Sequence, residues 1–188
     1  MKYTPAIPLT TAVLATSQPV DGTDLSKFLT SARKAAVDPM VLPTALADLV
    51  ISSEACGLVS IDDELNQLES RNDELLRSAS KISTSREAER TAKTLNAVRS
   101  ALGRSERRLR SLECLLGACL QYMQELRTTT PNQIPRRAMD AASRILKAHN
   151  SNMHSDIVHL LLQIQNSHGR VQTQQQFVRN PEDLHPVS

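Results

Sequence analysis

The chain has 188 residues with 22 basic and 20 acidic side chains, so its net charge of +2 argues for neither a nucleic acid nor a membrane surface as partner. Aromatic side chains make up only 2% of the residues, and Trp is absent, which argues against a broad globular core. Five Gly leave few tight turns for β-sheets or phosphate-binding loops. The composition therefore favours an all-α protein.

The amino-terminal part of the chain is predicted to be a flexible arm followed by a short helix. Residues 1–22 contain three of the nine prolines and many Thr, a composition that resists regular structure. Residues 23–38 place apolar side chains at helical spacing, which predicts a short amphipathic helix. Pro39 and Pro43 then bracket a linker, after which Thr44 can cap the next helix.

The strongest pattern is a heptad series of apolar side chains within residues 44–128, a region predicted to form long helices. A first seam alternates spacings of three and four residues without an error. Asn72 falls at a core position, where an amide fixes register and partner number at some cost in stability. The first-seam residues that we expect to bind a partner helix are Leu58, Ile61, Leu65, Leu68, Asn72 and Leu75.

A second seam follows in the same region, and its register does not join that of the first. Extending the first register would place Arg86 and Glu89 among the apolar positions. Thr84 and Glu87 have the spacing of a capping box, but Gly and Pro are missing, so the sequence favours a continuous helix with a register shift near 83–87 over a break that folds the chain back. The expected partner-binding residues of the second seam are Leu95, Val98, Leu102, Leu109, Leu112 and Leu116.

The carboxy-terminal part is predicted to hold one more helix and a tail. Prolines near residue 131 end the long helical region, and residues 135–169 carry one apolar face that can fold back antiparallel on residues 90–126. Residues 170–188 are rich in Gln and are interpreted as a flexible tail. The sequence as a whole thus predicts an elongated coiled-coil or helical-hairpin subunit with flexible termini, and leaves open whether the seams pair within or between chains.

Charges are distributed unevenly along the predicted helices. Residues 62–74 are mainly acidic and residues 86–110 mainly basic, which suits pairing of successive helices within the chain or between chains. Arg104, Arg107 and Arg108 share one helical face and could meet phosphates or an acidic protein surface. The alternative is a solvated face opposite the apolar seam, and this interpretation is preferred because aromatic side chains do not interleave the arginines.

No residue pattern points to catalysis, a metal or a cofactor. His154 and His159 are five residues apart, which separates them by about 140° around a helix and suits no shared metal. The three Cys are an odd set without a CxxC pair, and this indicates a reducing compartment. The amino terminus does not match a signal peptide, and no apolar run approaches the roughly 20 residues that span a bilayer. We expect no enzyme, no small-molecule substrate and no membrane or nucleic-acid partner.

The order and spacing of these segments resemble the small subunits of augmin, of the fly Dim-γ-tubulin type. The resemblance covers residues 24–168: a short helix, a heptad helix with Leu65, Leu68 and Leu75, a polar interruption, a second heptad stretch, a link with Pro, and a final helix. It implies a non-catalytic subunit of a complex that recruits γ-tubulin to spindle microtubules for centrosome-independent microtubule generation in mitosis.

The resemblance also implies partners and a location. The partners would be other helical subunits of a hetero-oligomer and, indirectly, microtubules or the γ-tubulin machinery, in the cytoplasm and on the cytoskeleton of the mitotic spindle. Two alternatives stay open. One is a subunit of a kinetochore or of a vesicle or lysosome tethering complex, and the other is a nucleic-acid or filament binder that uses the Arg104–Arg110 face.

Overall fold

The computed structural model describes residues 40–78, 84–129 and 136–179, together with Ser26 and Thr30. Within these ranges nearly every residue is helical and no strand occurs, so the all-α prediction is confirmed. The predicted arm 1–22, all but Ser26 and Thr30 of the predicted short helix 23–38, and the proposed tail beyond residue 179 lie outside the described residues. The helices are α2 (Val41–Ser78), α3 (Thr84–Thr129) and α4 (Arg136–Arg179).

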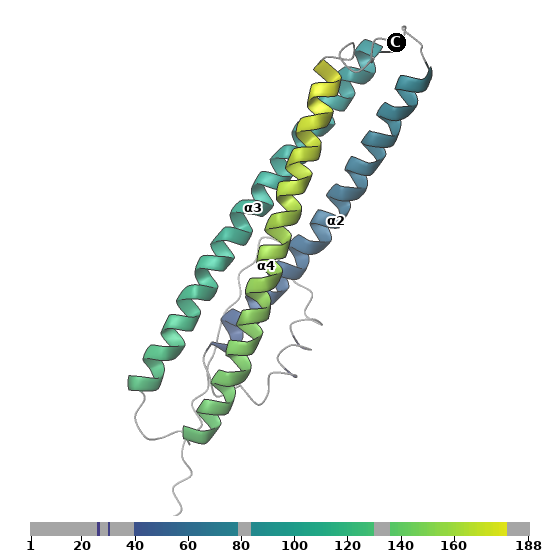
Figure 1. Ribbon diagram of the computed structural model, residues 1–188. Helices are drawn as coiled ribbons and strands as arrows, with labels where there is room; N and C mark the ends of the chain where they lie inside the picture. Colours follow the sequence, from purple (N-terminus) through teal and green to yellow (C-terminus); the bar gives the residue numbers. More distant parts are fainter. Residues whose placement is uncertain (1–25, 27–29, 31–39, 79–83, 130–135, 180–188) are drawn as a thin grey trace, which may run out of the picture.

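The three helices lie side by side as a bundle within one chain (Figure 1). α2 and α4 run in the same direction, and α3 runs antiparallel to both. α3 and α4 share the largest interface, as expected for the predicted fold-back of the last helix. The heptad seams therefore pair with each other in one chain, and the question that the sequence left open is answered for this structure.

The prediction of a continuous helix through residues 83–87 was wrong. α2 ends at Ser78, α3 begins at Thr84, and the two helices pack against each other. Packing two apolar stripes against one another removes much more apolar surface from water than a single long helix could. This gain in free energy favours the fold-back even without a Gly or Pro to break the helix. The register mismatch between the two seams marks the change from one helix to the next.

The start of α2 also differs from the sequence-based prediction. The helix begins at Val41, and Pro43 lies in its first turn instead of in a linker. Proline is tolerated there because the first N–H groups of a helix have no partner within it. The Thr44 N–H donates to the Met40 carbonyl at 3.1 Å. Thr44 is thus a buried helical residue and not the cap.

The last helix is longer than predicted and includes ten residues that were assigned to the tail. α4 continues through Gly169 to Arg179. Gly within a helix costs only about 1 kcal/mol relative to Ala, and tertiary contacts offset this cost. Val171 is buried in the core, and Val178 packs against it. Packing therefore extends the helix beyond its predicted end at residue 169.

The interior of the bundle holds two apolar clusters. The larger combines the seams of α2 and α3 with one face of α4, which contributes Met153, Ile157, Leu160, Ile164 and Val171. Each fully buried side chain of this size contributes roughly 1.5 to 3 kcal/mol. The smaller cluster lies near the start of α2 and consists of Val41, Met123, Ala142 and Leu146.

Asn150 lies on α4 between Leu146 of the smaller cluster and Met153 of the larger one. It is 1% exposed, and neither atom of its amide has a hydrogen-bond partner within the described part of the chain. We therefore expect Asn150→Leu to raise the free energy of unfolding by about 1 to 2 kcal/mol, because a desolvated amide is replaced by an apolar group. Urea unfolding followed by circular dichroism measures this. The exposed Asn152→Leu should leave the midpoint unchanged; a lower midpoint for Asn150→Leu would contradict the prediction.

α2 is long and apolar enough over Val41–Glu74 to cross a membrane, by length and composition alone. This differs from the expectation that no apolar stretch approaches that length. The same residues provide one side of the bundle core, and a core helix can reach this composition without a membrane.

Candidate partner-binding surfaces

The seam residues that the sequence assigned to partner binding lie inside the bundle. Ile61 is partly buried against the larger cluster, and the side chain of Leu75 lies outside the described residues. Because the chain's own helices cover this surface, a partner meets other residues as long as the bundle is closed. The buried seam residues are Leu58, Leu65, Leu68, Asn72, Leu95, Val98, Leu102, Leu109, Leu112 and Leu116.

Asn72 makes the interior polar contact between α2 and α4. Its Nδ2 donates to Oε1 of Gln174 at 2.5 Å, and Asn72 is only 4% exposed. A hydrogen bond between two side chains in one layer of the core can form in only one alignment of the two helices. Asn72, which was predicted to fix register, thus bonds within the chain, to a residue that the sequence had assigned to the tail.

Glu54 is a buried carboxylate that the sequence analysis missed. Its Oε1 accepts a hydrogen bond from Nη1 of Arg108 at 2.9 Å, and its side chain is 6% exposed. The signal was present, because extending the first seam backwards from Leu58 by spacings of four and three reaches Glu54 and Ile51. One of the three predicted surface arginines is thus a partner of a core residue.

We expect Arg108→Ala to lower the free energy of unfolding by about 1 to 2 kcal/mol, because it leaves the buried carboxylate of Glu54 without its ion-pair partner. Arg107→Ala is the matched control, since Arg107 is the exposed neighbour in the chain. Glu54→Met should restore stability in the Arg108→Ala background. Denaturant unfolding of the wild type, Arg108→Ala, Glu54→Met and the double variant, analysed as a double-mutant cycle, measures the coupling; additive effects would argue against the pair.

The other predicted surface arginines, Arg104 and Arg107, are exposed. None of the ion pairs within the described ranges includes either of them. The Arg107 guanidinium lies over the backbone of Gly103, where a Cβ atom would be 3.7 Å from Nη1. Arg110, by contrast, donates to Glu106 on its own helix at 3.0 Å. Two cations of the Arg104–Arg110 face are therefore without an acidic partner in the described part of the bundle.

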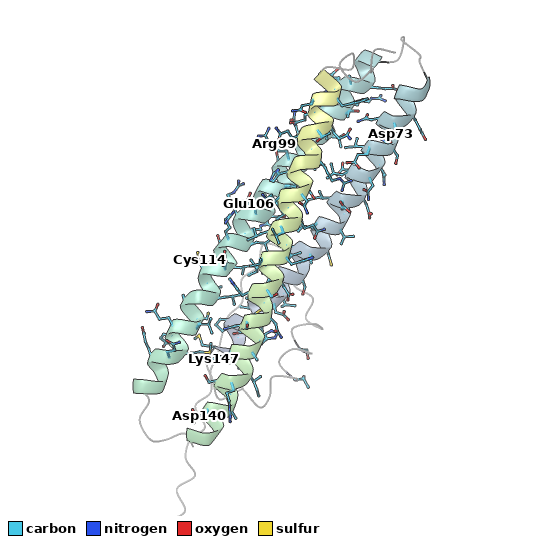
Figure 2. All side chains as sticks on the ribbon, in the orientation of Figure 1. Asp73, Arg99, Glu106, Cys114, Asp140 and Lys147 are labelled. Carbon is cyan, nitrogen blue, oxygen red and sulfur yellow. The ribbon has the colours of Figure 1, made fainter. Side chains whose placement is uncertain are left out.

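The acidic stretch of α2 binds a single arginine of α4. Arg170 donates through Nε and Nη2 to the carboxylate of Glu69 at 2.9 and 2.8 Å, and through Nη1 to Asp62. Nη2 also donates to Oδ1 of Asn66 at 2.6 Å. The sequence had suggested that this stretch pairs with the basic residues 86–110, within the chain or between chains. Figure 2 shows side chains bridging α2 and α4 along the half of the bundle that holds Asp73.

These contacts change the proton affinity of the arginine. The hydrogen bond to Glu69 raises the pKa of Arg170, burial opposes this, and the negative charges of Glu69 and Asp62 raise it further. The guanidinium is therefore held in its charged form in this cluster.

A shallow groove between α2 and α3 has an apolar floor. It is lined by Val50 of α2 and by Leu112 and Leu115 of α3, and Arg107 and Arg108 stand at its rim. Val50 is 39% exposed and Leu115 is 45% exposed. Large apolar side chains that face solvent in a groove with charged edges are typical of protein-binding surfaces.

A second groove runs between α3 and α4. Its apolar part includes Val158, Leu161 and Leu162, and of these Leu162 is 55% exposed. A polar depression adjoins it at His168, lined by glutamines of α4 and by Arg99 of α3. Figure 2 labels Arg99 and Glu106, which border the two parts of this groove from α3.

Two histidines of α4 lie in isolated pairs with carboxylates of the other helices. His149 lies 3.8 Å from Asp48, and His154 lies 3.8 Å from Glu113. Within the described ranges no group of three or more His, Cys, Asp or Glu side chains is placed to hold a metal. Cys119 lies on the seam, where burial raises the pKa of its thiol, and it packs there as a small apolar side chain.

Fold and surface together define an all-α chain with a three-helix bundle whose outer grooves carry exposed apolar side chains. No protein-family model matches the chain, and neither a curated protein nor a solved structure matches it.

Proposed function

We propose that the chain is a non-catalytic helical scaffold subunit that binds helices of other proteins on the outside of its bundle. The observation that carries this proposal is the exposure of Val158 and Leu162, at 42% and 55%, in the groove between α3 and α4. These two residues are one helical turn apart, so they form one apolar stripe beside the partly buried Leu161. A partner helix that covers the stripe removes this area from water.

The surface by which such a scaffold would bind its partners differs from the one that the sequence suggested. The sequence assigned partner binding to two apolar seams and left open whether they pair within or between chains, whereas in the structure the chain covers these seams itself. Under the proposal the seams make the bundle stable, and the grooves on its surface select partners. Preorganised helices lose little conformational entropy on binding, which favours a scaffold role.

As the particular complex we propose augmin, on the resemblance in the order and spacing of the helical segments. The partners are then the other helical subunits, and the site of action is the mitotic spindle, where the complex recruits γ-tubulin to existing microtubules. A kinetochore or vesicle-tethering complex is the alternative, and the identity of the partners distinguishes these cases. Cross-linking mass spectrometry on the tagged full-length chain isolated from dividing cells identifies them.

We expect Leu162→Asp to abolish co-purification of the main partners while the bundle remains folded, because an exposed position accepts a charge but an apolar interface does not. The measurement combines affinity isolation from cells with circular dichroism of the purified variant. Ser155→Asp, an exposed position one heptad earlier on α4, is the matched control and should retain the partners. Retention of the same partners by Leu162→Asp would contradict a docking role for this groove.

A further inference from the structure

We infer that the groove between α2 and α3 binds an acidic amphipathic helix of a partner protein. The inference rests on the proposed scaffold function and gives it a second surface with a partner of stated chemistry. It combines two observations, an apolar floor and a positively charged rim.

The floor of the groove consists of side chains that the bundle itself does not cover completely. Val50 and Leu115 are 39% and 45% exposed, and the buried Leu112 also lines the groove. They come from two helices, so an added helix that lies along the groove contacts both. Leucine or isoleucine side chains on one face of such a helix would fill the groove.

The rim supplies charge of one sign. Arg108 is compensated by Glu54, but the exposed Arg104 and Arg107 meet no acidic side chain in the described part of the bundle. Arg107 lines the groove, and Arg104 lies one helical turn before it on the same face of α3. The groove therefore has one uncompensated positive charge at its rim and a second beside it. A partner helix with glutamate or aspartate beside its apolar face is complementary to both features.

A phosphate polymer fits this surface less well than a helix does. Phosphates would satisfy the arginines but would leave Val50 and Leu115 in water. Arg107 and Leu115 are two helical turns apart, about 12 Å along α3, so a helix that lies along α3 reaches both with side chains two turns apart. The apolar floor thus favours a protein partner over the nucleic-acid or filament alternative for the Arg104–Arg110 face.

The test uses the full-length chain and two synthetic amphipathic peptides of about 20 residues, which is long enough to cover α3 from Arg104 to Leu115. Both carry the same leucine face, and the flanking positions are all Glu in one and all Lys in the other. Fluorescence anisotropy should show the Glu peptide binding at least about tenfold more tightly than the Lys peptide. High salt should reduce the difference between the two peptides.

Two changes in the protein separate the contributions of rim and floor. Arg104→Glu combined with Arg107→Glu should weaken binding of the Glu peptide at least about tenfold and favour the Lys peptide, because the sign of the rim is reversed. Leu115→Asp should weaken both peptides. Arg99→Glu, on α3 beside the other groove, is the control and should change neither. All these variants keep the Glu54–Arg108 pair, and thermal unfolding verifies the bundle.

Three outcomes would overturn the inference: equal binding of both peptides, an unchanged affinity in the double charge reversal, or binding of duplex DNA that displaces the Glu peptide and is unaffected by Leu115→Asp. Failure of the inference is distinguishable from failure of the scaffold function. If the chain binds no Glu peptide but retains its partners in cells, only the assignment of this groove is wrong. If the chain binds the peptide but has no cellular partners, the scaffold function is wrong and the assignment of the groove stands.

Discussion

Leu65→Asp is expected to unfold the bundle, with a loss of at least about 4 kcal/mol in the free energy of unfolding. Leu65 is 0% exposed in the larger cluster, so the new carboxylate would lose its water without gaining a counter-ion. A loss of this size is comparable to the whole stability of many small domains. Far-UV circular dichroism of the purified chain in increasing urea measures it. Gln67→Asp, two residues further on and exposed, is the control and should unfold near the wild-type midpoint.

The same experiment decides between pairing within the chain and pairing between chains. If the seam is closed within one chain, Leu65→Asp loses its helical signal at any protein concentration. A variant that keeps its midpoint as an isolated chain would show that the first seam is not covered by α3 and α4. Charge substitutions in the seam, at Leu68 or Leu112 for example, therefore remove partners by unfolding the subunit, and they are poor probes of the binding surface.

Much of the fold follows from local patterns in the sequence. The heptads that begin at Leu58 and Leu95 correspond to the buried faces of α2 and α3, because burial and periodicity depend on the same residues. The boundary at residues 128–135 was also predicted, since α3 ends at Thr129 and α4 begins at Arg136. Proline restricts the backbone of its own turn, so its effect on the end of a helix can be predicted from the local sequence.

What the sequence did not predict depends on contacts between distant segments. The fold-back between α2 and α3 needs no special residue, because the gain comes from covering both seams. The helical state of residues 170–179 depends on Val171 in the core and on the bond between Gln174 and Asn72. Likewise, Glu54 is accepted in the interior because Arg108 of another helix reaches it. Local propensity contains none of this information.

The candidate surfaces were the least predictable part of the molecule. Sequence periodicity separates a buried stripe from the remainder of a helix, but it does not show which exposed residues meet those of a neighbouring helix. Val50 and Leu115 are far apart in the chain and share a groove only because α2 and α3 pack antiparallel. The arginines beside them were recognised as a face, whereas the apolar floor between the helices was not.

Arg170→Met is expected to lower the free energy of unfolding by about 2 to 3 kcal/mol, a smaller loss than that of Leu65→Asp. Methionine keeps much of the aliphatic stem but removes the hydrogen bonds to Glu69, Asp62 and Asn66. The two carboxylates then remain close together without a cation. Arg144→Met on an exposed face of α4 is the matched control and should have little effect. Urea unfolding at low and high salt provides the measurement.

Two further comparisons identify the source of this stabilisation. Arg170→Lys retains the charge but cannot donate from two nitrogens to one carboxylate, so it should recover only part of the loss. Because the folded state raises the pKa of Arg170, its contribution is complete below the usual arginine value and is lost only in strong alkali, as the pH rises through the raised pKa. The difference between wild type and Arg170→Lys should therefore stay constant from about pH 7 to pH 9, where arginine and lysine both remain charged. A difference that grew across this range would mean that some other titrating group stabilises the contact between α2 and α4.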